Sequence, residues 1–154
     1  MNDITQDISG AEIAHTLDVR SKLSALGAAM IPMPQLDIPL QHTFAPGLYV
    51  REMHMPAGSL VLGKIHNHDH IVIIASGDCT VYSKDGLQRL KGPCTVTYSA
   101  GTQRAIYAHA DTHWLNVHAV NTNDIDQAEA YLVTEEYPDT EWLIAAAKQI
   151  TEEV

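Results

Sequence analysis

The chain has 154 residues, of which 45% are apolar and 18% are charged, and its mean hydropathy is −0.09. This composition excludes a disordered or fibrous chain, and the length predicts one domain with a sizeable hydrophobic core. The formal net charge is −10 and the sequence has no basic stripe, which excludes nucleic acid and an anionic membrane surface as partners.

The same survey indicates the compartment. No run of 18 apolar residues occurs, so we expect no membrane span. The start of the chain lacks the basic and then apolar order of a signal peptide, and we therefore expect a cytoplasmic protein. Cys79 and Cys94 are too few for a disulfide framework and are expected to be free thiols.

Residues 1–40 are predicted to form a helix followed by an extended arm. Ile13, Leu17 and Leu23 approximate the period of an amphipathic helix over residues 10–30. The next segment, IPMPQLDIPL, contains three prolines, which forbid a helix and discourage a paired strand. This apolar arm has few hydrogen-bond donors with which to fold on itself. We therefore expect it to lie along a second copy in a dimer or higher homo-oligomer.

Residues 41–120 have the pattern of an all-β domain. Turn signals separate short runs of β-branched and aromatic residues, which is typical of a sandwich or a barrel. Asp85-Gly86 predicts a two-residue hairpin turn of type I′, because that turn needs positive φ at its central positions. The expected strands lie in GLYVREMHM, SLVLGKIH, HIVIIA, CTVYS, LQRLK, CTVTYS, RAIYAHA and HWLNVHAV.

Residues 121–154 are expected to form an acidic helical segment. Their net charge is −8, whereas residues 40–120 carry a net charge of +1. The segment NTNDIDQAEAYLV opens with capping residues and predicts a short helix. The alanines at 145–147 favour a second helix near the C-terminus.

Histidine is the residue type most informative about function, with nine copies in the chain. Neutral imidazole is a ligand for zinc, iron, nickel and copper, whereas magnesium and calcium prefer oxygen. His66, His68 and His70 alternate in KIHNHDHIV, so an extended strand projects all three to one face. A turn across residues 67–69 instead brings His66 and His70 to the same end of the domain and directs His68 away.

A further imidazole is expected from the last predicted strand. His118 shares one strand face with Trp114 and Asn116, and that strand belongs to the same sheet system. If a divalent transition metal is bound, we expect His66 and His70 as its first ligands. His118 is the expected third ligand, with His68 as its substitute. A protein without a metal is the alternative.

Two motifs resemble those of the cupin superfamily, over about residues 47–120. The first runs from PAG through KIHNHDHIVIIASGD, and the second is GPCTVTYSAGTQRA. The resemblance implies a cupin-like β-barrel, or double-stranded jelly roll, that holds a metal ion with four side chains. Counted from the motif glycines, those four positions correspond to Lys64, His66, His70 and Arg104. Arginine does not coordinate metal ions, so another residue must close such a site if a metal is bound.

The runs PAGSLVLGKIHNHDH and SAGTQRAIYAHADTHW also resemble small cupin-like proteins encoded by tailed bacteriophages. This narrower resemblance implies the cytoplasm of a bacterial host, with the virion as the alternative location. It implies no particular reaction. The sequence therefore predicts neither catalytic residues nor whether the protein is an enzyme.

Three functions are compatible with these residues. The first is a His-lined pocket that binds a divalent metal, a small anionic molecule or both. Arg104 is its candidate clamp for a carboxylate or phosphate, with Lys64 and Tyr107 as further ligand-binding residues. The second is a non-enzymatic phage structural or accessory protein whose barrel is an oligomerisation scaffold. The third is a metal-free binder of an anionic ligand anchored by Arg104.

Overall fold

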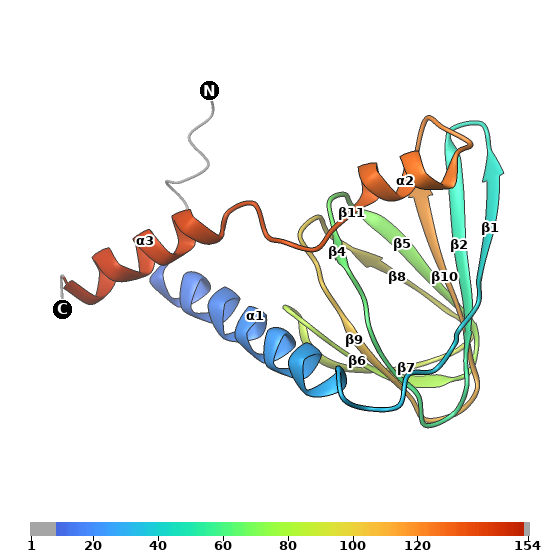
Figure 1. Cartoon of the computed structure of the whole chain (residues 1–154), viewed down its shortest axis with the longest axis horizontal. Coiled ribbons are helices and arrows are strands. Elements are labelled where there is room, and N and C mark those ends of the chain that lie inside the picture. The colour runs from blue at the N-terminus through green and yellow to red at the C-terminus, as the bar shows by residue number, and fades with distance from the viewer. Residues whose placement is uncertain (1–8, 153–154) are drawn as a thin grey trace.

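The computed structural model describes residues 9–152 as a mostly β fold flanked by helices (Figure 1). The helices are α1 (Gly10–Met30), α2 (Ile125–Leu132) and α3 (Thr140–Glu152). The strands are β1 (Leu40–Ala45), β2 (Leu48–Met55), β3 (Leu60–Leu62), β4 (Ile65–His66), β5 (His70–Ser76), β6 (Asp78–Ser83), β7 (Gly86–Lys91), β8 (Cys94–Tyr98), β9 (Ala105–Ala108), β10 (Thr112–Ala119) and β11 (Val133–Thr134).

Helix α1 begins at a capping box formed by Ser9 and Glu12. The Ser9 hydroxyl accepts the Glu12 amide at 3.2 Å, and the Glu12 carboxylate accepts the Ser9 amide at 2.8 Å. The helix has 21 residues and agrees with the one predicted over residues 10–30. Leu23 is buried against Ala105, so α1 covers the outer face of the sheet that contains β9.

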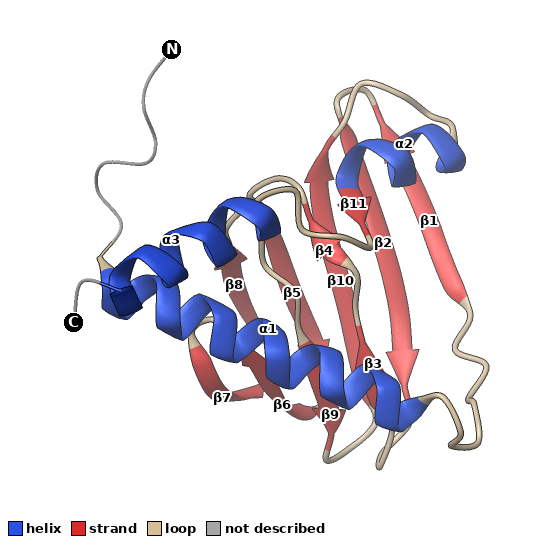
Figure 2. Cartoon of the chain, turned by 60° about the vertical axis from the view of Figure 1, so that its left-hand side comes forward, coloured by secondary structure: helices blue, strands red, loops and turns tan. Residues whose placement is uncertain are grey.

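Two antiparallel sheets face each other and enclose the main core (Figures 1 and 2). One has five strands in the order β1-β2-β10-β5-β8, and the other has four in the order β3-β9-β6-β7. Strands β4 and β11 form a separate two-stranded ladder. The buried core consists of Met55, Val72, Ile74, Cys79, Val81, Tyr98, Ile106, Ala108 and Trp114.

The predicted mostly β fold with terminal helices is confirmed, whereas the closed barrel is not. The described strands fall into separate hydrogen-bonded sheets, and no ladder joins the edges of the five-stranded and four-stranded sheets. No helix occurs between residues 43 and 120, all of which the structure describes. The predicted run SLVLGKIH is divided into β3 and β4, because residues 63 and 64 do not pair as a strand.

The hairpin between β6 and β7 differs from the predicted turn. Ser83 pairs with Gly86, so that Lys84 and Asp85 form the loop. Only Gly86 has a positive φ, at 84°, and Asp85 does not. The glycine therefore follows the tight turn, as in hairpins that combine a type I turn with a glycine bulge, instead of occupying a central position of a type I′ turn.

The helices leave one sheet face uncovered. Helices α1 and α3 lie on the side of the four-stranded sheet, whereas α2 covers one end of the space between the sheets (Figures 1 and 2). Ala128 and Leu132 of α2 pack on Tyr49 of β2. No described helix covers the outer face of the five-stranded sheet, where Ile71 is 42% exposed. Within residues 9–152, no helix is long and apolar enough to cross a membrane.

Candidate functional site

Three buried imidazoles meet between the sheets, near the end that α2 covers. His66 ends β4, His70 begins β5 and His118 comes from β10, and each is less than a tenth exposed. The ring centroids of His66 and His70 are 4.2 Å apart. The ring of His118 lies 5.6 Å from that of His66 and 5.0 Å from that of His70. We call His66, His70 and His118 the inner cluster; they are the three histidines that the sequence groups together.

His68 lies apart from the inner cluster. Its ring stacks on Tyr131 of α2, with 4.2 Å between the centroids. The alternation of strand faces ends at His66, because residues 67–69 form a loop between β4 and β5. Of the two conformations that the sequence allows for this segment, the structure has the turn.

The guanidinium of Arg104 lies against the inner cluster and is itself 4% exposed. Its Nη1 donates to Nε2 of His70 at 2.7 Å, and its Nη2 donates to Oδ1 of Asn116 at 3.0 Å. Its Cζ lies 4.4 Å from the ring centroid of Tyr98 and 5.5 Å from that of Trp114. Aromatic faces and neutral acceptors stabilise the cation. No described carboxylate forms an ion pair with it.

Both ring nitrogens of His70 have hydrogen-bond partners. Nδ1 lies 3.0 Å from the carbonyl oxygen of His68, so it must carry the proton and donate. Nε2 then has the lone pair that accepts from Arg104. A metal ion on Nε2 must displace the guanidinium, and its positive charge repels that of Arg104. The residues present therefore do not fit a metal ion held as the cupin resemblance implies, and we derive no chemistry through one.

Burial keeps the inner imidazoles neutral. Loss of hydration, followed by the charge of Arg104, lowers the pKa of His66 to about 2 and the pKa of His70 to about 4. Loss of hydration, followed by the neighbouring His70, lowers the pKa of His118 to about 3. Burial also lowers the pKa of Arg104 to about 10, which leaves the side chain positive at neutral pH. The interior therefore holds one positive charge.

A cavity of about 270 Å³ lies between the sheets beside Arg104 and His66. This volume is near the lower end of the range for small-molecule sites. Its cationic lining residues are Arg51, Lys64 and Arg104, and no carboxylate of a residue that the structure describes lines it. Its apolar walls include Ile38, Met53, Val61, Ile106, Trp114 and Val133.

Two of the three cations have acidic partners at the solvent edge of the cavity. Arg51 lies 3.5 Å from Oε1 of Glu129 on α2. Lys64 lies 3.8 Å from the same oxygen and 4.0 Å from Oε1 of Glu135, and its side chain is 46% exposed. Lys64 thus lines the cavity with its ammonium group already paired, and its expected role in ligand binding stays a prediction. Of the three cations, Arg104 is the one for which the described part of the chain supplies no acidic partner.

Tyr107 does not reach the cavity. It is 43% exposed, and its ring meets that of His109 edge-on with 5.0 Å between the centroids. Its neighbour Ile106 points into the core, and successive residues of a strand face opposite sides. The structure therefore does not bring Tyr107 together with Arg104 and Lys64.

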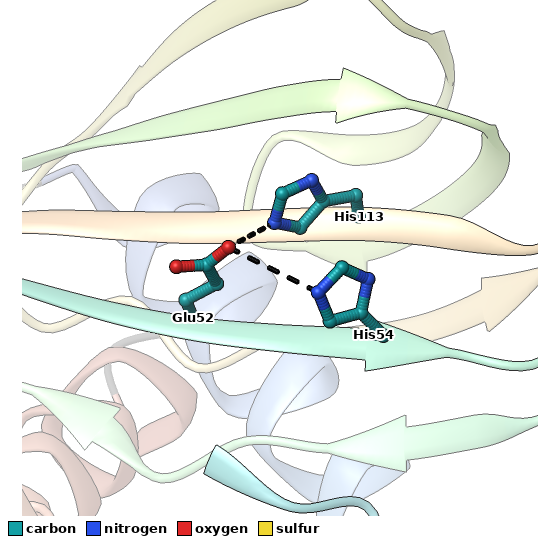
Figure 3. Close-up of side chains that lie close together, drawn as sticks. All are labelled: Glu52, His54 and His113. Carbon is teal, nitrogen blue, oxygen red and sulfur yellow. Dashed lines mark hydrogen bonds and ion pairs between the residues drawn. The ribbon is translucent and has the colours of Figure 1, made fainter. Parts of the chain in front are cut away.

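A second group of histidines lies on the opposite side of the five-stranded sheet. Glu52, His54 and His113, which we call the outer triad, each offer one potential ligand atom, and these atoms lie within 4.8 Å of one another (Figure 3). None of these three residues is among the metal ligands expected from the sequence. The available signal is the spacing Glu-x-His in GLYVREMHM, which places Glu52 and His54 on one strand face.

Comparisons with known proteins agree on the fold. No protein-family profile and no curated protein matches the sequence. The structure is similar to KdgF from Halomonas sp., with a TM-score of 0.50 and 15% sequence identity, over 60% of this chain and 88% of that one. A cupin superfamily protein from Desulfitobacterium hafniense DCB-2 has a TM-score of 0.48 and 14% identity, over 60% of this chain and 86% of that one. The structural neighbours thus include cupin superfamily proteins, and the likeness concerns the fold alone.

Proposed function

We propose that this protein is a jelly-roll protein of the cupin type that binds a small carboxylate in its interior cavity, with Arg104 as the anchor. The observation that carries the proposal is the burial of Arg104 beside the cavity without an acidic partner among the described residues. An unpaired buried charge is costly, and a bound anion supplies the missing partner. A planar carboxylate matches the geometry of the guanidinium fork.

The surroundings of Arg104 support a ligand that is partly apolar. Most of the cavity wall is aliphatic or aromatic, which favours a hydrocarbon portion next to the carboxylate. His66 lines the same cavity, and its Nδ1 is buried without a hydrogen-bond partner in the described part of the chain. Because buried polar atoms are usually hydrogen-bonded, a polar group of the ligand is its expected partner.

The proposal is tested by calorimetric titration with benzoate and with benzamide, its uncharged isostere. We expect benzoate to bind and benzamide to bind at least about tenfold more weakly, since a charged hydrogen bond contributes roughly 1.5–3 kcal/mol. Arg104→Met removes the charge with little change of volume and should abolish benzoate binding. Arg104→Lys keeps the charge but loses the fork, and should bind with intermediate affinity.

Arg89→Met is the matched control, because Arg89 is a 55% exposed arginine paired with Asp78 on the β6–β7 hairpin. It should bind benzoate like the wild type. Equal affinity for benzoate and benzamide contradicts the proposal. Wild-type affinity in a folded Arg104→Met variant contradicts it as well.

A second candidate role is that of an assembly scaffold in a phage, which rests on the narrower sequence resemblance. The exposed apolar side chains of the arm favour association with another copy, since Ile31 is 78% and Leu36 is 62% exposed. Virion incorporation in fixed stoichiometry is the test of that role. Metal binding by the inner cluster also stays a prediction, and it requires that Arg104 be replaced or displaced.

A further inference from the structure

We propose that the outer triad of Glu52, His54 and His113 is a binding site for a divalent first-row transition metal ion such as zinc. The site lies on the outer face of the five-stranded sheet, away from the cavity and from Arg104. It is therefore independent of the proposed carboxylate site. Two imidazoles and one carboxylate form a ligand set that suits zinc or iron(II) and leaves coordination positions open.

Strand register brings the three side chains together. Strands β2 and β10 are adjacent and antiparallel, and His54 lies directly opposite His113. Glu52 lies two residues before His54 on β2, so its side chain leaves the same face of the strand. Directly opposite residues have Cβ atoms roughly 5 Å apart, which is within reach of a shared ion. The backbone pairing therefore fixes where the three side chains start.

A β-bulge occurs at the same place. The register between β10 and β5 shifts between His113 and Trp114: Trp114 pairs with Ile74, whereas His113 pairs with Ser76. Bulges change the direction of side chains and are frequent beside functional sites. Here the irregularity separates Trp114, which is fully buried in the core, from His113, whose side chain is 25% exposed.

The three potential ligand atoms already converge. Nε2 of His113 donates a hydrogen bond to Oε1 of Glu52, and Nε2 of His54 lies 3.9 Å from the same oxygen (Figure 3). The two imidazole rings are stacked, with centroids 4.1 Å apart and planes inclined by 16°. Tetrahedral zinc with bonds of about 2.0–2.2 Å separates its ligand atoms by roughly 3.3 Å. Small side-chain rotations therefore convert the hydrogen-bonded triad into a ligand set.

Metal binding replaces the hydrogen on Nε2 of His113. Coordination through Nε2 requires its lone pair, so the single N–H proton of the neutral ring moves from Nε2 to Nδ1 through solvent. Glu52 then binds the ion through the oxygen that accepts the hydrogen bond in the metal-free protein. The carboxylate supplies one negative charge against the two positive charges of the ion.

Space for further ligands exists beside the imidazoles. A hollow of about 250 Å³ is bordered by His54, His113, Ser76 and Asp111. The side chains of Glu52 and His113 are 21% and 25% exposed, whereas that of His54 is 64% exposed. The site is thus half-buried on one side and open to water on the other. Water or a small ligand can complete the coordination shell.

The test uses protein purified without a histidine tag and titrated with zinc chloride against a chromophoric chelator. We expect one zinc ion per chain at the outer triad. Zinc binding should weaken by more than about 100-fold in each of the variants His54→Ala, His113→Ala and Glu52→Gln. Loss of a residue that only hydrogen-bonds a metal ligand weakens binding by about 10- to 100-fold, so a larger loss indicates direct coordination. Cobalt(II) bound at this site should have a low coordination number and should therefore give a visible absorption band. That band should disappear in the same three variants.

Two control variants make the outcome specific. His109→Ala removes an exposed histidine outside the triad, whose ring is hydrogen-bonded to Thr80, and should leave zinc binding unchanged. The double variant His66→Ala/His70→Ala removes two imidazoles of the inner cluster and should also keep one zinc ion. Glu52→Gln is nearly isosteric, so a fold defect, checked by circular dichroism, is not expected. A wild type without bound zinc, or full zinc binding in the triad variants, overturns the proposal.

Discussion

On the inner face of the five-stranded sheet, His70 and His118 are 4% and 3% exposed and lie next to a guanidinium. On the outer face, the side chains of His54 and His113 are 64% and 25% exposed and lie next to a carboxylate. The same side chain thus occurs on both faces of one sheet with opposite partners. A cation and low polarity hold the inner rings neutral, and the cation takes the lone pair that a metal needs. The outer rings lie next to a carboxylate and are open to water, and both features favour the binding of a metal cation.

The comparison shows that the number of histidines alone does not identify a metal site. The inner cluster contains more imidazoles than the outer triad, yet a buried arginine stands among them. What decides the chemistry is the charge of the nearest non-histidine neighbour: Arg104 on the inner face and Glu52 on the outer face. The proposed binding of an anion inside and of a cation outside rests on that difference.

The largest expected effect is acid destabilisation through the inner cluster. Its histidines have lowered pKa values in the folded protein and take up protons near pH 6.5 when the chain unfolds. Their contribution to stability is therefore fully present above about pH 6.5 and is lost progressively as the pH falls through the folded-state pKa values, the lowest of which is about 2. The slope of the unfolding free energy should reach at most about 4 kcal/mol per pH unit, for three protons taken up.

Urea denaturation at a series of pH values measures this slope. His66→Phe should reduce it by about a third, since one titrating group is removed. Ile71→Ala, on the exposed outer face, is the control, because it changes stability without changing proton uptake. A slope in His66→Phe equal to that of the wild type would show that the inner rings do not titrate on unfolding.

The next effect concerns the charge of the anchor. Arg104→His removes the guanidinium and places a fourth imidazole beside the inner cluster, at the position where the cupin resemblance expects a histidine ligand. We expect this variant to bind one more zinc ion per chain than the wild type, measured by elemental analysis of untagged protein. Arg104→Met is the matched control and should gain none. If neither variant binds more zinc than the wild type, the guanidinium is not what keeps metal from the inner face.

The smallest effect concerns the arm, which supplies Ile38 and Leu40 to the cavity lining and exposes its other apolar side chains. We expect at least a dimer in sedimentation analysis at micromolar concentration. Replacing Ile31, Met33 and Leu36 with serine should shift the protein towards the 16.9 kDa monomer. Leu87→Ser, at an equally exposed site on β7, should not. A wild-type monomer would refute the expectation.

Much of the fold was accessible from local patterns. The structure agrees with the helix expected over residues 10–30, although only some of its apolar residues recur at a helical spacing, and with the strands β5, β6 and β8, which are dense in β-branched residues. Strand β1 carries no such pattern, because it is an edge strand whose side chains alternate between exposed and half-buried. Whether the sheets close into a barrel depends on pairing between strands that are far apart in the sequence. The residue pattern of a single strand does not predict such pairing.

The positions of the inner-cluster histidines were predictable from the sequence because one short turn brings His66 and His70 together. The loop at residues 67–69 is short, so His66 and His70 must lie near each other, and strand alternation then places His118 with Asn116. The outer triad depends on the pairing of β2 with β10, whose partners His54 and His113 are far apart in the sequence. Tyr107 illustrates the limit of residue-type reasoning, since a shift of one position turns a side chain to the other face.

The pairing of Glu129 and Glu135 with the cations at the solvent edge sets the valence of the ligand. These acids supply negative charges to Arg51 and Lys64, so the only unbalanced charge at the cavity among residues 9–152 is that of Arg104. A monovalent anion neutralises it. A divalent anion brings a second charge that must either break the contacts of Glu129 or stay buried without a partner, and both are costly. The cavity should therefore discriminate monocarboxylates from dicarboxylates and phosphate monoesters by charge, before shape is considered.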